Sequence, residues 1–137
     1  MTGTGRWSSA ALMLSGVAGI VTPKGFLSAL DLSADSPRGL AETRAGLGGT
    51  YAALGAWALV SRAPAAEAAV GATWLGAAAA RIAALRLDRP RTDAAYWAFL
   101  GLELGCGTAA VASALARSRD RDGTGTGVGS QGTDRDL

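Results

Sequence analysis

Long stretches without any charged residue alternate along this chain with short charged segments. The uncharged stretches cover residues 8–23, 45–61, 68–80 and 94–101. An amphipathic helix of a soluble protein needs polar side chains at every third or fourth position on one face, and these stretches have no charged face. The pattern therefore favours a polytopic membrane protein over the alternative, a buried helical bundle of a soluble protein.

Helix-start signals divide the chain into four spans, which we expect at about residues 6–22, 37–60, 64–87 and 93–117. Ser36 and Thr92 are suited to cap the second and fourth spans, and a proline suits the first helical position at Pro37 and Pro64. Pro23 ends the first span. The apolar residues after it predict a short helix that lies at the membrane interface.

We therefore predict an all-α fold, a four-helix transmembrane bundle in one domain over residues 1–117. Its short loops make neighbouring helices antiparallel, in an up-down-up-down order. The polar segment 118–137 has one aliphatic residue, Val128, before the terminal Leu137. Such a segment buries too little apolar surface to order itself, so we expect a disordered tail.

Composition removes several classes of function. The chain has no histidine and a single cysteine, Cys106, so no metal ion or other cofactor is expected. The net charge of +2 is small, and the arginines flank predicted helix ends instead of forming a patch for nucleic acid. The expected partner is the lipid bilayer.

The chain is expected in the cell membrane as a multi-pass protein. The first apolar stretch lacks a small-residue cleavage site at Thr22-Pro23-Lys24, so we interpret it as a retained span and not as a signal peptide. Lysine and arginine are balanced between the two predicted faces, so the positive-inside rule gives no orientation. The charged tail is costly to translocate, which favours termini in the cytoplasm.

Arg81 and Glu103 interrupt two otherwise apolar spans, each eleven positions from Thr92 in the turn between them. In antiparallel helices they meet at one depth, either as a structural ion pair or as a working site. Arg44 is expected in the same layer, since it and Arg81 are equidistant from the preceding turn. Glu42 is expected about one turn nearer the surface.

Helical periodicity adds aromatic residues to this layer, and we expect a small amphipathic pocket lined by Tyr51, Trp74, Tyr96 and Phe99. Closely spaced glycines, such as Gly46, Gly48 and Gly49, indicate close helix packing or a homo-oligomer contact and not a dinucleotide loop. Cys106 is interpreted as a buried, inert thiol.

The order of Glu42-Thr43-Arg44, Gly48-Gly49, a lone Arg81 and a lone Glu103 resembles a family of small bacterial four-helix membrane proteins classed as a domain of unknown function. The resemblance covers roughly residues 10–117. It implies a four-helix integral membrane fold and no particular activity.

Three functions remain open from the sequence. The first is a non-catalytic membrane protein that binds a lipophilic small molecule, with Glu42 among the binding residues, or a partner protein. The second is a membrane-embedded enzyme for isomerisation, cyclisation or epoxide opening, with Glu103 as acid or base and Arg81 and Arg44 stabilising negative charge. The third is a proton-coupled transporter, which we rank last because the first span contains no acidic residue.

Overall fold

The computed structural model describes residues 3–61 and 63–125 of the chain. Its elements are the helices α1 (Gly3–Val21), α2 (Pro23–Ala29), α3 (Pro37–Glu42), the π-helix η1 (Thr43–Gly49), α4 (Thr50–Ser61), α5 (Pro64–Leu87) and α6 (Ala94–Gly125). No strand occurs among these residues. The predicted all-α class is confirmed.

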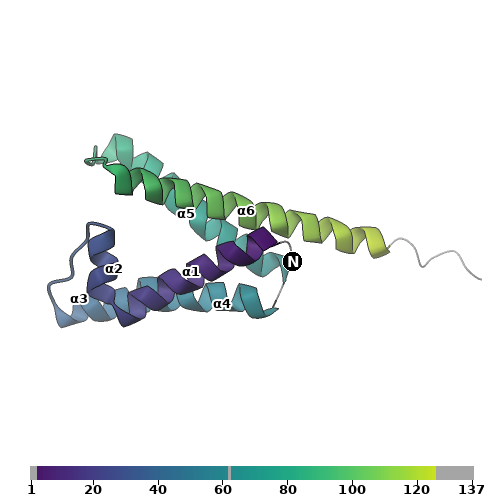
Figure 1. Ribbon diagram of the computed structural model, residues 1–137, viewed down its shortest axis with the longest axis horizontal. Helices are drawn as coiled ribbons and strands as arrows, with labels where there is room; N and C mark the ends of the chain where they lie inside the picture. The colour runs from purple at the N-terminus through teal and green to yellow at the C-terminus, as the bar shows by residue number, and fades with distance from the viewer. Residues whose placement is uncertain (1–2, 62, 126–137) are drawn as a thin grey trace, which may run out of the picture.

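Two antiparallel helix pairs form the molecule. In the first pair α1 lies along η1 and α4, and in the second α5 lies along α6. The pairs meet chiefly where α1 crosses α6, and α4 also touches α5. They diverge towards the end that carries α2, α3 and the α5–α6 turn (Figure 1).

The helices α3 and α5 begin where the predicted capping residue and prolines place them, and the cap of α6 differs from the prediction. Ser36 Oγ accepts a hydrogen bond from the Gly39 amide at 3.0 Å, and α3 and α5 both begin at a proline. The predicted cap Thr92 is displaced by its neighbour, because Asp93 Oδ1 accepts from the Tyr96 amide at 2.8 Å. Asp93 is the better cap here, since its carboxylate also opposes the positive end of the helix dipole.

The second predicted span is one continuous helical rod of three parts, α3, η1 and α4. The backbone at both junctions, Thr43 and Thr50, stays in the right-handed helical region. The central part, η1, has the wider turn of a π-helix, in which hydrogen bonds join residues five apart. Side chains on η1 are therefore turned away from the directions that regular α-helical periodicity predicts.

Glycines allow α1 to approach this rod backbone to backbone. A Cβ atom on Gly55 would lie 2.7 Å from the Ser9 carbonyl oxygen, and one on Gly16 would lie 2.6 Å from the Gly48 carbonyl oxygen. No larger residue fits at these positions without moving α1. This use of small residues is typical of helix packing in membranes.

The helix α6 continues past the predicted end at Arg117 and reaches Gly125, the last residue that the structure describes. The beginning of the expected disordered tail is thus helical. The remainder of that predicted tail, residues 126–137, lies outside the described residues.

The core contains small side chains, and many large apolar ones lie outside. Ala58, Ala66 and Ala110 are fully buried, whereas Trp7 is 77% exposed and Val60 is 82% exposed. Two helical segments, Pro64–Leu87 and Ala94–Arg121, are long and apolar enough to cross a membrane.

Candidate functional site

The structure brings Arg81 and Glu103 together as a two-pronged ion pair between α5 and α6. Nε of Arg81 donates to Oε2 of Glu103 at 3.0 Å, and Nη2 donates to Oε1 at 2.7 Å. Glu103 is only 6% exposed. This fork geometry fixes the relative register of the two helices, as the equal spacing about Thr92 predicts.

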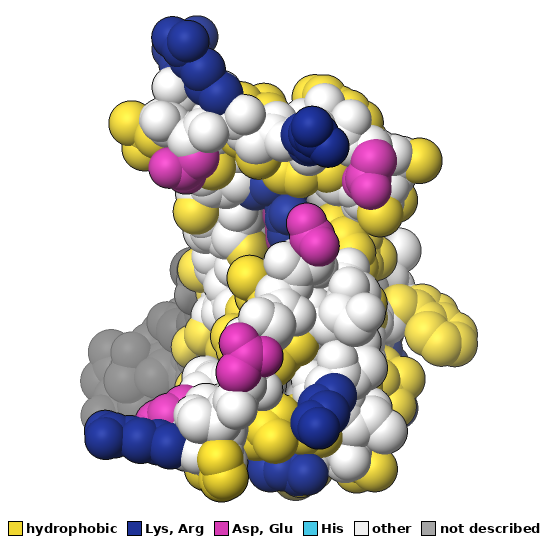
Figure 2. Space-filling view, turned by 90° about the vertical axis from the view of Figure 1, so that its left-hand side faces the viewer, with side chains coloured by type: hydrophobic (Ala, Val, Ile, Leu, Met, Phe, Trp, Pro, Cys, Tyr) yellow, Lys and Arg dark blue, Asp and Glu magenta, His cyan; other side chains and the backbone are white. Residues whose placement is uncertain are grey.

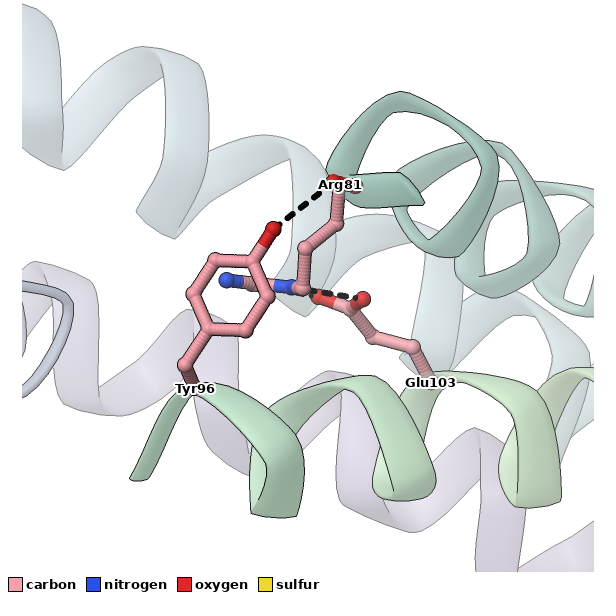
Figure 3. Close-up of polar contacts among 3 residues, drawn as sticks. All are labelled: Arg81, Tyr96 and Glu103. Carbon is pink, nitrogen blue, oxygen red and sulfur yellow. Dashed lines mark hydrogen bonds and ion pairs between the residues drawn. The ribbon is translucent and has the colours of Figure 1, made fainter. Parts of the chain in front are cut away.

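Two aromatic side chains from the first turns of α6 hold Arg81 in place. The Tyr96 hydroxyl donates to the Arg81 carbonyl oxygen at 2.7 Å. The guanidinium carbon lies 5.3 Å from the Tyr96 ring centroid and 5.7 Å from the Phe99 ring centroid. Figure 3 shows one guanidinium nitrogen of Arg81 directed away from Glu103 and beside the Tyr96 ring.

A cavity of about 460 Å³ opens beside this ion pair, between the two helix pairs. Its wall contains Arg81, Glu103 and all four predicted aromatics, Tyr51, Trp74, Tyr96 and Phe99, together with Phe26 from α2. Both tyrosines and both phenylalanines of the chain thus line one cavity. The remaining wall is mostly aliphatic, and Leu12, Leu30, Ala77, Ala80, Ala84 and Leu102 contribute to it.

A second, more polar cavity of about 430 Å³ lies on the outer side of Arg81. It shares Leu30, Arg81, Pro90, Tyr96 and Phe99 with the first cavity, and Ser28, Asp31, Arg91 and Asp93 also line it. Figure 2 views the molecule from this end, where charged side chains gather around a recess between the upper and lower helices. Arg81 therefore lies at the junction of an apolar cavity and a polar entrance.

Arg44 and Glu42 do not belong to this site, contrary to the prediction. Arg44 is exposed, and its Nη1 donates to the carbonyl oxygen of Ile20 in the last turn of α1. The last carbonyl groups of a helix have no hydrogen-bond donor within the helix, and they form the negative end of the helix dipole. An arginine there donates a hydrogen bond and also brings a positive charge close to that negative end. Glu42 is 3.9 Å from Arg38 in an exposed pair on α3.

A second buried ion pair joins α5 and α6 at the other end of the molecule, and the sequence analysis missed it. Nη2 of Arg117 contacts Oε2 of Glu67, whose side chain is fully buried. The spacing in the sequence could have predicted this pair, because Glu67 and Arg117 are also equidistant from Thr92, twenty-five positions on each side. The helix pattern alone places Arg117 at the end of the fourth span and does not indicate a buried contact for it.

The two ion pairs repeat one arrangement. Each helix carries a glutamate followed fourteen positions later by an arginine, Glu67 to Arg81 on α5 and Glu103 to Arg117 on α6. Antiparallel packing joins each glutamate to the arginine of the other helix. The α5–α6 pair therefore has two-fold pseudo-symmetry in its buried charges, and only the Arg81 pair borders the cavity.

Arg81 keeps unused hydrogen-bonding capacity at the site, and so do the hydroxyls of Tyr51 and Ser15 in the cavity wall, which have no partner within residues 3–61 and 63–125. Both carboxylate oxygens of Glu103 accept from its guanidinium. Nη1 of Arg81 has no hydrogen-bond partner within residues 3–61 and 63–125. In the same part of the chain no group of three or more histidine, cysteine or acidic residues is arranged to hold a metal ion.

Comparisons of the chain with protein-family models, with curated proteins and with solved structures give no match.

Proposed function

We propose that this chain is a four-helix integral membrane protein that binds a lipophilic small molecule between its two helix pairs. In this proposal the Arg81–Glu103 pair forms the polar end of the binding site. The protein belongs to the cell membrane as a multi-pass protein, and the resemblance to small bacterial four-helix membrane proteins fits the same proposal.

The distribution of apolar side chains supports four membrane crossings. Large apolar residues point outwards from each rod, for example Leu14 on α1, Val60 on α4, Ile82 on α5 and Leu104 on α6. Exposed large apolar side chains on all four rods suit contact with lipid better than contact with water. The rod from Pro37 to Ser61 is about 37 Å long at 1.5 Å per residue, and α1 is about 28 Å long. Both lengths suit a hydrocarbon core of about 30 Å.

One observation carries the binding proposal: the Arg81–Glu103 pair, whose arginine keeps an unused guanidinium N–H, lies in the wall of an apolar, aromatic cavity. Binding sites for small molecules have volumes of about 300–1,000 Å³, mainly apolar walls and a few polar groups that fix orientation. The cavity of about 460 Å³ beside Arg81 has all three properties. An ion pair that only fixes the relative register of two helices does not require an open cavity beside it.

The same geometry favours binding over acid–base catalysis. Catalysis by Glu103 requires a carboxylate that exchanges a proton with the substrate, whereas both of its oxygens accept from Arg81. Proton-coupled transport through Glu103 requires the same exchange. Binding at Arg81 leaves the pair intact.

Fluorescence quenching of Trp74 tests the proposal, because this indole lines the cavity and is only 7% exposed. The test protein keeps Trp74 and replaces Trp7, Trp57 and Trp97 with phenylalanine. It is purified in detergent and titrated with a brominated alkyl alcohol, whose heavy atoms quench indole emission on contact. We expect saturable quenching that an unbrominated alcohol of equal length reverses.

A matched variant that keeps Trp57 alone is the control, since Trp57 is 51% exposed on the outer surface of α4. Its quenching should rise in proportion to the probe in the micelle and not saturate. Equal, non-saturable quenching of both variants would show that Trp74 meets the probe only through the detergent, and would overturn the proposal.

A further inference from the structure

We propose that the ligand of this cavity is an uncharged, flat conjugated molecule with a carbonyl oxygen, the chemistry of a quinone or an aromatic ketone. Its carbonyl oxygen would accept a hydrogen bond from Nη1 of Arg81. This inference rests on the proposed function and names the class of molecule that the same site takes.

The charges at the polar end of the cavity argue against an ionic ligand. Arg81 and Glu103 neutralise each other at 2.7 Å, so a bound ion would have no unpaired opposite charge to meet there. An anion at Arg81 would also meet the carboxylate of Glu103, and the cavity wall contains a further carboxylate at Asp88. A cation would meet the guanidinium itself. Burying an unpaired ion costs far more than burying a neutral polar group.

Charges at the polar entrance do not change this conclusion. Asp31, Arg91 and Asp93 are exposed there, so solvent screens them. Asp93 is also engaged, because it caps α6. No excess of positive charge draws an anion inwards, and the exposed acids do not extend to the Arg81–Glu103 pair.

The unused donors beside the ion pair favour a ligand with a hydrogen-bond acceptor. An arginine has five N–H donors and no acceptor, and the fork to Glu103 uses Nε and Nη2. The Tyr96 hydroxyl already donates to the Arg81 carbonyl oxygen. The donor left at this point is the outward side of the guanidinium, which Figure 3 shows beside the Tyr96 ring. A carbonyl oxygen is the neutral group that matches it.

The aromatic side chains in the cavity wall favour a ligand with a flat ring system. Phe26, Tyr51, Trp74, Tyr96 and Phe99 surround the cavity from four different helices. Aromatic side chains gain extra interaction energy from ring contacts in offset or edge-to-face geometry. A flexible alkyl chain would use none of this geometry, and a conjugated bicyclic molecule would.

Four probes of similar shape test the inference by calorimetric titration into protein-loaded nanodiscs, with empty nanodiscs as the blank. They are 2,3-dimethyl-1,4-naphthoquinone, 2,3-dimethylnaphthalene, 2-naphthoate and 2-naphthylmethylammonium. We expect the quinone to bind about tenfold more tightly than the hydrocarbon, which is the strength of one hydrogen bond to a charged donor. We expect both ions to bind more weakly than the hydrocarbon.

The double variant Arg81→Met, Glu103→Leu identifies the origin of any preference. It removes the ion pair without leaving a buried single charge, and it should bind the quinone and the hydrocarbon equally. Equal binding of these two probes to the unmodified protein would overturn the carbonyl inference while leaving the proposed function intact. If either ion bound more tightly than the hydrocarbon, the inference would be overturned as well. Absence of binding by all four probes, including the hydrocarbon, would contradict both proposals.

Discussion

Arg117 on α6 contacts the fully buried carboxylate of Glu67 on α5, and this pair repeats the Arg81–Glu103 pair with the helices exchanged. The two pairs lie fourteen residues apart along each helix, a separation of about 21 Å. One pair closes the end where the helix pairs meet, and the other borders the cavity. The two ends of the same helix pair thus have different environments and different expected roles.

Loss of the Glu67 charge should strongly destabilise the fold. Glu67→Gln removes the buried carboxylate that Arg117 contacts, and removal of one member of a buried pair typically costs about 3–5 kcal/mol. The free energy of unfolding, measured by titration with denaturing detergent, should fall by about that amount. The exposed pair of Arg38 and Glu42 provides the control, since Glu42→Gln should leave this free energy unchanged.

Removal of both charges of this pair should restore most of the lost stability. In Glu67→Leu, Arg117→Met both charges are absent, so no uncompensated charge is buried and most of the stability should return. A double variant as unstable as Glu67→Gln would show that hydrogen bonding or shape at this position matters more than charge pairing.

A methyl group at Gly16 should separate α1 from the second helical rod. Its Cβ atom would lie 2.6 Å from the Gly48 carbonyl oxygen, so Gly16→Ala should cost about 1–3 kcal/mol through overpacking. Gly105→Ala is the matched control, because a Cβ atom there meets nothing within 4 Å. That variant should be neutral or slightly stabilising in the same unfolding measurement. Equal effects of the two variants would contradict the close packing of α1.

The Tyr96 hydroxyl should contribute a modest, measurable stabilisation. Tyr96→Phe keeps the ring beside Arg81 but removes the hydrogen bond to its carbonyl oxygen, with an expected loss of about 0.5–1.5 kcal/mol. Tyr51→Phe serves as the comparison, since the Tyr51 hydroxyl has no hydrogen-bond partner within residues 3–61 and 63–125. Thermal unfolding in detergent should distinguish the two; a larger loss for Tyr51→Phe would refute the assigned contact.

Arg44 should affect stability and not binding. Arg44→Met removes the cap on the last turn of α1, with an expected loss of up to about 1 kcal/mol. The saturable quenching of Trp74 by a brominated alcohol should keep the same midpoint. A shifted midpoint would show that Arg44 contributes to binding and would contradict its assignment as a helix cap.

The sequence was sufficient for several features of the fold and site. Pro64 and the polar turn after Leu87 give the bounds of α5, and Ser36 gives the start of α3. The equal distances of Arg81 and Glu103 from Thr92 predict their meeting, because antiparallel helices with a tight turn pair residues symmetrically. Periodicity within α5 and α6 correctly placed Trp74, Tyr96 and Phe99 at the cavity.

The errors arise where the helix departs from regular geometry. The depth expected for Arg44 assumes an α-helix throughout the second span, and η1 begins at Thr43 with a wider turn. Local residue patterns do not specify such a π-helix, which depends on the fit against α1. The extension of α6 beyond Arg117 was also not predicted, because a polar segment buries too little apolar surface for order to be expected there.

Photolabelling tests the central claim most directly, namely that a lipophilic molecule occupies the cavity between the helix pairs. The protein in nanodiscs is illuminated with a diazirine-bearing aromatic ketone, and labelled positions are mapped by mass spectrometry. The account predicts labels on cavity residues such as Tyr51, Ala77 and Phe99, which an excess of 2,3-dimethyl-1,4-naphthoquinone suppresses. Labels confined to outward residues such as Leu14 and Val60, unaffected by the competitor, would contradict it.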